Sequence, residues 1–111
     1  MKTQAMNILG LEVPVILAPM GGAVGPELTA AVSNAGGLGL APLWRFGVEE
    51  LRASVRRIKG LTDKPFGVNL NLDFPSFEQL DVCLEEDVEV ISLFWQPPAN
   101  RVKTAFLGCQ R

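Results

Sequence analysis

The chain has 111 residues, a formal net charge of −2 and 48% hydrophobic residues. This length suits one domain, the charge excludes a basic surface for nucleic acid, and the hydrophobic content excludes a disordered chain. No apolar run reaches the roughly 18 residues that cross a bilayer, and the first residues do not form a signal peptide. We therefore expect a cytoplasmic protein without a membrane or nucleic-acid partner.

Residues that commonly bind metals are scarce. The chain has no His and two Cys, and Cys83 and Cys109 do not form a CxxC pair. We therefore expect no metal site. Cys83 lies among apolar residues and is interpreted as a small buried hydrophobe, while Cys109 is assigned no role.

The first predicted element is a buried strand at 13–18, which is short, apolar and rich in β-branched residues. A loop containing Gly21 and Gly22 follows, and a helix is expected to begin at Pro26. Gly36-Gly37 is expected to stop this helix. Its predicted apolar face consists of Leu28, Ala31, Val32 and Ala35.

Strands and helices continue to alternate after this first unit. Strands are predicted at 38–41, 65–70 and 88–94. One helix is predicted at 48–59 and another after 97–98. Between them, a helix is predicted to begin at an N-cap at Ser76, with Gln79 completing a capping box, and to run to about Glu86. The face of the 48–59 helix that should turn toward the protein core carries Leu51, Val55 and Ile58. Gly60 should end this helix. The basic residues of this helix are interpreted as a solvated face: Arg52, Arg56, Arg57 and Lys59.

The order of the elements predicts an α/β fold with parallel strands and a single domain over 1–111. Strand ends recur about every 25 residues, which fits about four βα units, the N-terminal part of a (β/α)8 TIM barrel. A small doubly wound sheet fits the same spacing, so periodicity leaves both folds open.

In either fold, ligands bind beyond the carboxyl ends of the strands. Those ends carry glycines, amides, Met20 and two tryptophans, and they carry no paired carboxylates. Such a lining can hold a flat neutral or anionic cofactor but does not indicate acid–base catalysis, so no catalytic residue is assigned. Asn69 could bond a ligand or cap the next loop, Met20 could line a site or pack in the core, and Trp44 and Trp95 could stack on a ring or pack their loops.

Glycines between the first helix and the second strand, at 36–39, precede a strand instead of following one. We interpret them as a helix stop and a tightly packed strand, since the dinucleotide fingerprint needs the order strand, glycines, helix.

Segments 14–22, 26–39, 64–70 and 88–94 resemble, in the right order, nitronate monooxygenases. The resemblance is best over 8–100, and 101–111 departs from it. It implies a TIM barrel that binds FMN at its C-terminal face and oxidises alkyl nitronates with O2. Met20 and Gly22 match the loop that lies against the isoalloxazine, and Asn69 matches an asparagine that contacts the flavin.

In the family, a catalytic His and the loops that grip the FMN phosphate lie in later segments, which the chain does not match. We therefore expect this chain alone to bind FMN weakly or not at all and to lack turnover of nitronates. Two alternatives remain: part of a flavin-dependent enoyl reductase that uses NAD(P)H, and a non-enzymatic half barrel that self-associates through its open sheet edges.

Overall fold

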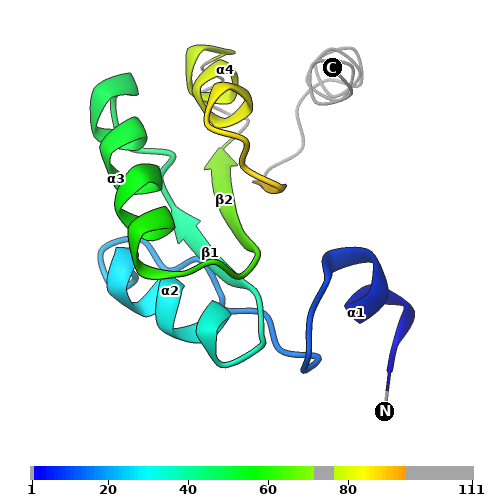
Figure 1. Cartoon of the computed structure of the whole chain (residues 1–111). Helices are drawn as coiled ribbons and strands as arrows, with labels where there is room; N and C mark the ends of the chain where they lie inside the picture. Colours follow the sequence, from blue (N-terminus) through cyan, green and yellow to red (C-terminus); the bar gives the residue numbers. More distant parts are fainter. Residues whose placement is uncertain (1, 72–76, 95–111) are drawn as a thin grey trace.

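The computed structural model describes residues 2–71 and 77–94 (Figure 1). It contains α1 (Gln4–Leu9), α2 (Pro26–Asn34), β1 (Gly39–Pro42), α3 (Val48–Leu61), β2 (Phe66–Asn71), α4 (Phe77–Glu85) and β3 (Val90–Phe94). The predicted Ser76 cap, Trp95, the helix after 97–98, Cys109 and the 101–111 tail lie outside the described residues.

The three strands form a parallel sheet in the order β1-β2-β3. The segment before β1 adds to the same edge, because Ile16 forms a parallel bridge with Leu38. Neighbours in the sheet are therefore neighbours in the sequence, without the reversal of strand order that defines a doubly wound sheet. Figure 1 shows α2 and α3 along one side of the strands and α1 near the start of β2.

The predicted strand at 13–18 is wrong as a buried, regular strand. It makes the single bridge at Ile16, and the Val15 and Ile16 side chains are 55% and 52% exposed. Two backbone hydrogen bonds hold it to β1, from Leu38 N–H to Val15 O and from Leu17 N–H to Leu38 O, both 2.9 Å. Its other edge has no neighbouring strand among the described residues, and a strand paired on one side alone is only partly covered.

The core lies between the sheet and helices α2, α3 and α4. Leu51, Val55 and Ile58 of α3 are each 0% exposed, as their spacing predicts. They pack against the residues of β2 that alternate toward the helices, Phe66, Val68 and Leu70.

The predicted apolar face of α2 is wrong. Its buried residues are Thr29, Ala30 and Ser33, whereas Leu28 is 42% exposed. Small side chains face the sheet because α2 lies very close to it: the Gly39 N–H donates to Ser33 Oγ at 3.1 Å. This close approach confirms the interpretation of the glycines at 36–39 as a helix stop followed by a tightly packed strand.

Helix ends differ from the prediction in two places. α3 continues through Gly60 to Leu61 and ends at Thr62, whose N–H donates to Ile58 O. The unpredicted α1 begins at Thr3, where Oγ1 accepts a hydrogen bond from the Met6 N–H, as N-cap threonines do.

The basic residues of α3 are not simply solvated, because they join α3 to its neighbours. Arg52 contacts Glu85 Oε2 at 2.7 Å and Glu86 Oε1 at 2.8 Å, and Arg56 contacts Glu86 Oε1 at 2.9 Å. Arg57 pairs with Glu27 of α2. The charge pattern reveals the exposed side of the helix, but it does not reveal acidic partners about 30 residues away.

The Arg52–Glu86–Arg56 cluster predicts a stability change with pH. Hydrogen bonds from Arg56 and Arg52 lower the pKa of the Glu86 carboxyl below its ordinary value of about 4.5. A carboxylate with a lowered folded pKa stabilises the fold above pH 4.5 and loses this contribution as pH falls through the lowered value. We expect Glu86→Gln to lower Tm at pH 6–7 and to have little effect once pH falls below the folded pKa, as measured by thermal melts.

A matched control for this experiment is Glu50→Gln, an exposed residue in the first turn of α3. It should shift Tm by less than Glu86→Gln at pH 7. A Tm difference between wild type and Glu86→Gln that is the same at pH 7 and pH 3 would contradict the prediction.

Two further observations concern the described residues. Within residues 2–71 and 77–94, no helix is long and apolar enough to cross a bilayer, and no group of His, Cys, Asp and Glu could hold a metal ion. Cys83 is 0% exposed on the inner side of α4. This burial confirms its interpretation as a packing residue.

Candidate functional site

The sheet has a second face that points away from the helices. Phe66, Val68 and Leu70 point into the helix-covered core, so the alternating residues of β2 point the other way. In a closed barrel this second face is the interior. Its residues follow from the register: Leu40, Pro42, Gly67, Asn69, Asn71, Val90, Ser92 and Phe94. No charged side chain belongs to this set, which is neutral toward the carboxyl ends of the strands.

Asn69 lies on this face and is 3% exposed. It is the register partner of Pro42 on β1 and of Ser92 on β3. Its Nδ2 lies 3.2 Å from Ser92 Oγ and 3.4 Å from the Ser92 carbonyl oxygen. The described hydrogen bonds of this side chain therefore run across the sheet to β3. The loop after β2, which the other interpretation has Asn69 cap, lies outside the described residues.

The loop after the 13–18 segment carries Met20 and Gly22. The Met20 side chain is 49% exposed, which excludes core packing for it. Its carbonyl oxygen accepts hydrogen bonds from the N–H groups of Ala23 at 3.1 Å and Val24 at 3.0 Å. Gly22 has φ +82°, and no atom lies within 4 Å of where its Cβ would be. The loop thus needs a glycine for its backbone and leaves open space beside it.

Parallel topology places Met20, Gly22 and Asn69 toward the same, carboxyl end of the strands, but within the described part of the chain they do not contact one another through a hydrogen bond. The Met20 loop follows the strand-like segment beside β1, and Asn69 lies on β2, so β1 separates them. Two strand spacings amount to about 10 Å, close to the width of a flat tricyclic ring. Within the described residues, no hydrogen bond joins the loop to Asn69.

Trp44, in the loop after β1, packs against the neighbouring Phe94 and Arg45 side chains. Its ring meets Phe94 edge-on, with ring centroids 5.8 Å apart, and the Arg45 guanidinium lies 4.5 Å from its ring centroid. Gln79 Nε2 of α4 donates to the carbonyl oxygens of Trp44, at 3.1 Å, and Phe46. These contacts confirm the loop-packing interpretation of Trp44.

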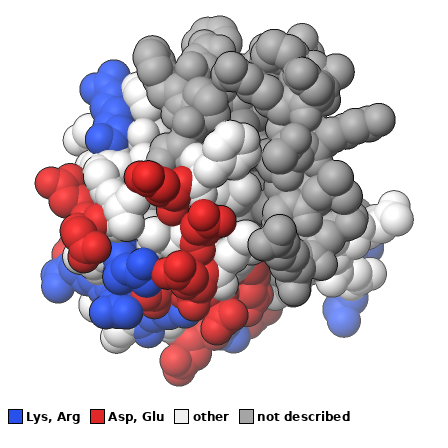
Figure 2. Space-filling model, turned by 90° about the horizontal axis from the view of Figure 1, so that it is seen from above, with Lys and Arg blue, Asp and Glu red and all other residues white. Residues whose placement is uncertain are grey.

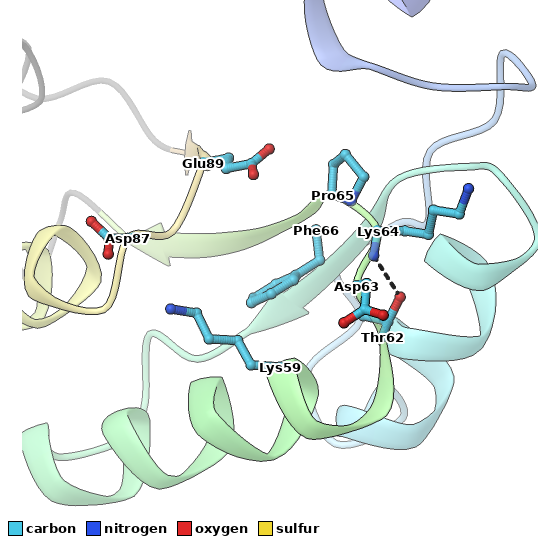
Figure 3. Close-up of a pocket in the computed structure, with 8 residues that line it drawn as sticks. All are labelled: Lys59, Thr62, Asp63, Lys64, Pro65, Phe66, Asp87 and Glu89. Atoms are coloured by element: carbon cyan, nitrogen blue, oxygen red, sulfur yellow. Dashed lines mark hydrogen bonds between the residues drawn. The ribbon is translucent and has the colours of Figure 1, made fainter.

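A hollow of about 380 Å³ lies at the opposite end of the sheet, where β2 and β3 begin (Figure 3). Its cations already have partners: Lys59 Nζ donates to the carbonyl oxygen of Glu86, and Lys64 Nζ pairs with Glu12. Three carboxylates also line the hollow. The full lining is Lys59, Thr62, Asp63, Lys64, Pro65, Phe66, Asp87 and Glu89. This end is therefore a poor site for an anion and lies far from the carboxyl ends of the strands.

Charge on the described surface is mixed. Figure 2 shows basic and acidic side chains next to one another on one side of the molecule.

Ser92 is the site residue that sequence reasoning missed. It holds Asn69 across the sheet, yet it lies inside an apolar strand and carries no motif. The available signal was one small polar residue at a position that alternates with the helix-facing Ile91 and Leu93.

A family model described as nitronate monooxygenase matches residues 2–92. A nitronate monooxygenase of Pseudomonas aeruginosa is 50% identical over 70 residues, covering 63% of this chain and 20% of that protein. A (3aS,4S,5R,7aS)-5-hydroxy-7a-methyl-1-oxo-octahydro-1H-indene-4-carboxyl-CoA dehydrogenase of Mycobacterium tuberculosis is 35% identical over 98 residues, covering 87% of this chain and 28% of that protein. The chain thus spans less than a third of the length of these relatives.

Two solved structures match the fold. FabK from Thermotoga maritima superimposes with a TM-score of 0.87 at 33% identity, covering 97% of this chain and 35% of FabK. A nitroalkane oxidase from Streptomyces ansochromogenes superimposes with a TM-score of 0.77 at 25% identity, covering 93% of this chain and 39% of that protein. Both are TIM barrels, so the chain has the fold of part of a (β/α)8 barrel, as its sequence predicts.

Proposed function

The chain belongs to the nitronate monooxygenase family, and from this premise we propose that its residues form one wall of an FMN site in a protein that oxidises alkyl nitronates with O2. The observation that carries the proposal is the neutral sheet face at the carboxyl ends of the strands, with buried Asn69 on it and the open loop at Gly22 beside it. Ligands of parallel α/β barrels bind at this end.

The described residues fit the ring portion of FMN. Gly22, which lacks a side chain, leaves room for a ring to approach the backbone, and the exposed Met20 side chain supplies an apolar surface beside it. Asn69 would hydrogen-bond the polar edge of the ring. When bound, FMN would supply the redox chemistry, accepting electrons that the substrate loses.

The described part of the chain contributes orientation rather than proton transfer. The sheet face at the site carries amides, a hydroxyl and apolar groups, none of which titrates near neutral pH. We therefore assign its residues the roles of holding the ring and excluding water from one side of it, and assign none of them a catalytic role.

The proposal predicts how the isolated 111-residue chain binds flavins. We expect FMN to bind no more than a few-fold tighter than riboflavin, because phosphate groups are usually held by backbone N–H groups at later barrel loops. Fluorescence titration measures both affinities. We also expect no nitronate-dependent O2 uptake.

Backbone NMR during the same titrations locates the ring. Shifts at Gly22 and around Asn69, with none at Gly60 of α3, would support the proposed wall. Shifts confined to the hollow around Phe66 and Glu89 would refute it, and micromolar FMN binding with nitronate-dependent O2 uptake would refute the expected weakness of this chain alone.

A flavin-dependent enoyl reductase is the second candidate, and the structural similarity to FabK favours it. The two activities differ in their reductant: an enoyl reductase consumes NAD(P)H, and a nitronate monooxygenase consumes the nitronate. Assays of NAD(P)H oxidation and nitronate-dependent O2 uptake on the protein as it occurs in its source would separate them.

Self-association is a further proposal, supported by the exposed edge at 13–18. Val15 and Ile16 are more than half exposed there, and a sheet edge with apolar side chains pairs readily with another chain. We expect Ile16→Lys to shift the chain from dimer toward monomer in sedimentation experiments. We expect Ile8→Lys, at an exposed α1 position outside the 13–18 segment, to leave the dimer intact. A monomeric wild type would contradict the proposal.

A further inference from the structure

We propose that Ser92 is a positioning residue: it orients the Asn69 side chain so that the carbonyl oxygen of the amide, not its NH2 group, is presented to a ligand at the carboxyl ends of the strands. This inference rests on the proposed function for its ligand. The orientation itself follows from the geometry of β2 and β3.

The two residues are register partners on adjacent strands, so their side chains lie on the same face of the sheet. Asn69 Nδ2 is 3.2 Å from Ser92 Oγ and 3.4 Å from Ser92 O. A hydroxyl can donate or accept, so the hydroxyl contact alone would allow either orientation of the amide. The carbonyl oxygen can only accept, and it therefore requires the NH2 group on the Ser92 side.

On its β1 side, the described part of the chain gives Asn69 no competing hydrogen bond. Its partner on β1 is Pro42, whose side chain neither donates nor accepts a hydrogen bond. Among the described residues no hydrogen bond reaches Asn69 Oδ1, while the side chain as a whole is 3% exposed. Ser92 is thus the residue that decides which end of this buried amide is held.

The orientation selects a class of ligand. An Oδ1 acceptor pairs with an N–H donor, whereas the reversed amide would pair with a ring carbonyl or an unprotonated ring nitrogen. The oxidised isoalloxazine ring has one such donor, the N–H of its imide at N3. The site would therefore favour a planar ring that carries an imide N–H over the same ring methylated at that nitrogen.

The orientation is tested on the apo chain by NMR of the Asn69 side-chain NH2 group. In wild type we expect one of its protons to exchange slowly with water. Ser92→Ala should speed this exchange about fivefold, the equivalent of one ordinary hydrogen bond. Ser92→Thr, which keeps the hydroxyl, should restore slow exchange, and Ser54→Ala on α3 should leave it unchanged.

The ligand preference is tested by titrating the same four proteins with FMN and with N3-methyl FMN. We expect wild type and Ser92→Thr to bind FMN about fivefold tighter than the methylated analogue, and Ser92→Ala to bind the two equally. An unchanged Asn69 exchange rate in Ser92→Ala, or an FMN preference that survives in that variant, would overturn the proposal.

The two experiments separate this inference from the proposed function. If no protein in the series binds either flavin, the FMN wall fails for this chain, and the NMR exchange rates alone decide whether Ser92 orients Asn69. If Ser92→Thr does not fold, the Asn69→Ala/Ser92→Ala double-mutant cycle replaces it: coupling of the two substitutions in urea unfolding supports the contact, and additivity overturns it.

Discussion

Replacing Gly39 with alanine is expected to lower the free energy of unfolding by about 3 kcal/mol or more. A Cβ at this position would overlap the Thr29 carbonyl oxygen and lie 2.8 Å from the carbonyl carbon and 2.9 Å from Ser33 Oγ. The atoms of Thr29 belong to the backbone of α2 and cannot rotate away, so the whole helix would have to move. That movement would also break the hydrogen bond from the Gly39 N–H to Ser33 Oγ.

Gly60→Ala is the matched control for this substitution. Gly60 lies near the end of α3, and no atom lies within 4 Å of its Cβ position. Alanine there should be neutral or stabilise the helix by up to about 1 kcal/mol. Urea unfolding followed by circular dichroism measures both variants, and a Gly39→Ala protein as stable as wild type would show that α2 is not held at this distance.

Leu51→Ala is expected to cost about 3 kcal/mol, whereas Leu28→Ala should cost less than about 0.5 kcal/mol. Both leucines lie on predicted apolar helix faces, but Leu51 is 0% exposed and Leu28 is 42% exposed. Truncation of Leu51 leaves a cavity in the core beside β2, while truncation of Leu28 exposes little that is not already in water.

The urea midpoints of the two leucine variants show whether the predicted apolar face of α2, which carries Leu28, is buried in solution. Equal losses at Leu51 and Leu28 would mean that the apolar face predicted from the sequence is buried in solution, for example against a second copy of the chain. A concentration-dependent loss at Leu28 alone would identify such a contact directly, because stability that depends on assembly rises with protein concentration.

The contrast between α2 and α3 shows which part of the fold a single sequence predicts. Bulky residues at helical spacing gave the correct buried face for α3, because leucine, valine and isoleucine fill the space above β2. The same rule failed for α2. Gly39 has no side chain, so α2 can lie so close to the sheet that only small residues fit between them. Hydrophobic spacing therefore predicts the buried face of a helix only when the helix lies far enough from the sheet for bulky side chains to fit between them.

The site divides in a similar way. Resemblance to a family pointed to Met20, Gly22 and Asn69, and all three lie toward the carboxyl ends of the strands. Their roles toward a ligand stay predictions. Ser92 could not be found in this way, because its importance depends on the register of β2 with β3. A register between strands some 20 residues apart is a tertiary property that no local pattern encodes.

The sheet order has a consequence for how the chain folds during synthesis. Each strand pairs with the one made just before it, so a new strand needs only the residues already outside the ribosome. The connections between successive strands, at 43–65 and 72–89, join neighbours along the chain, and the entropy cost of closing such a connection grows only slowly with its length. The barrel wall can therefore be laid down from its first edge in step with translation, and a pause after β2 would leave a nascent chain whose helix α3 already has a strand on which to pack.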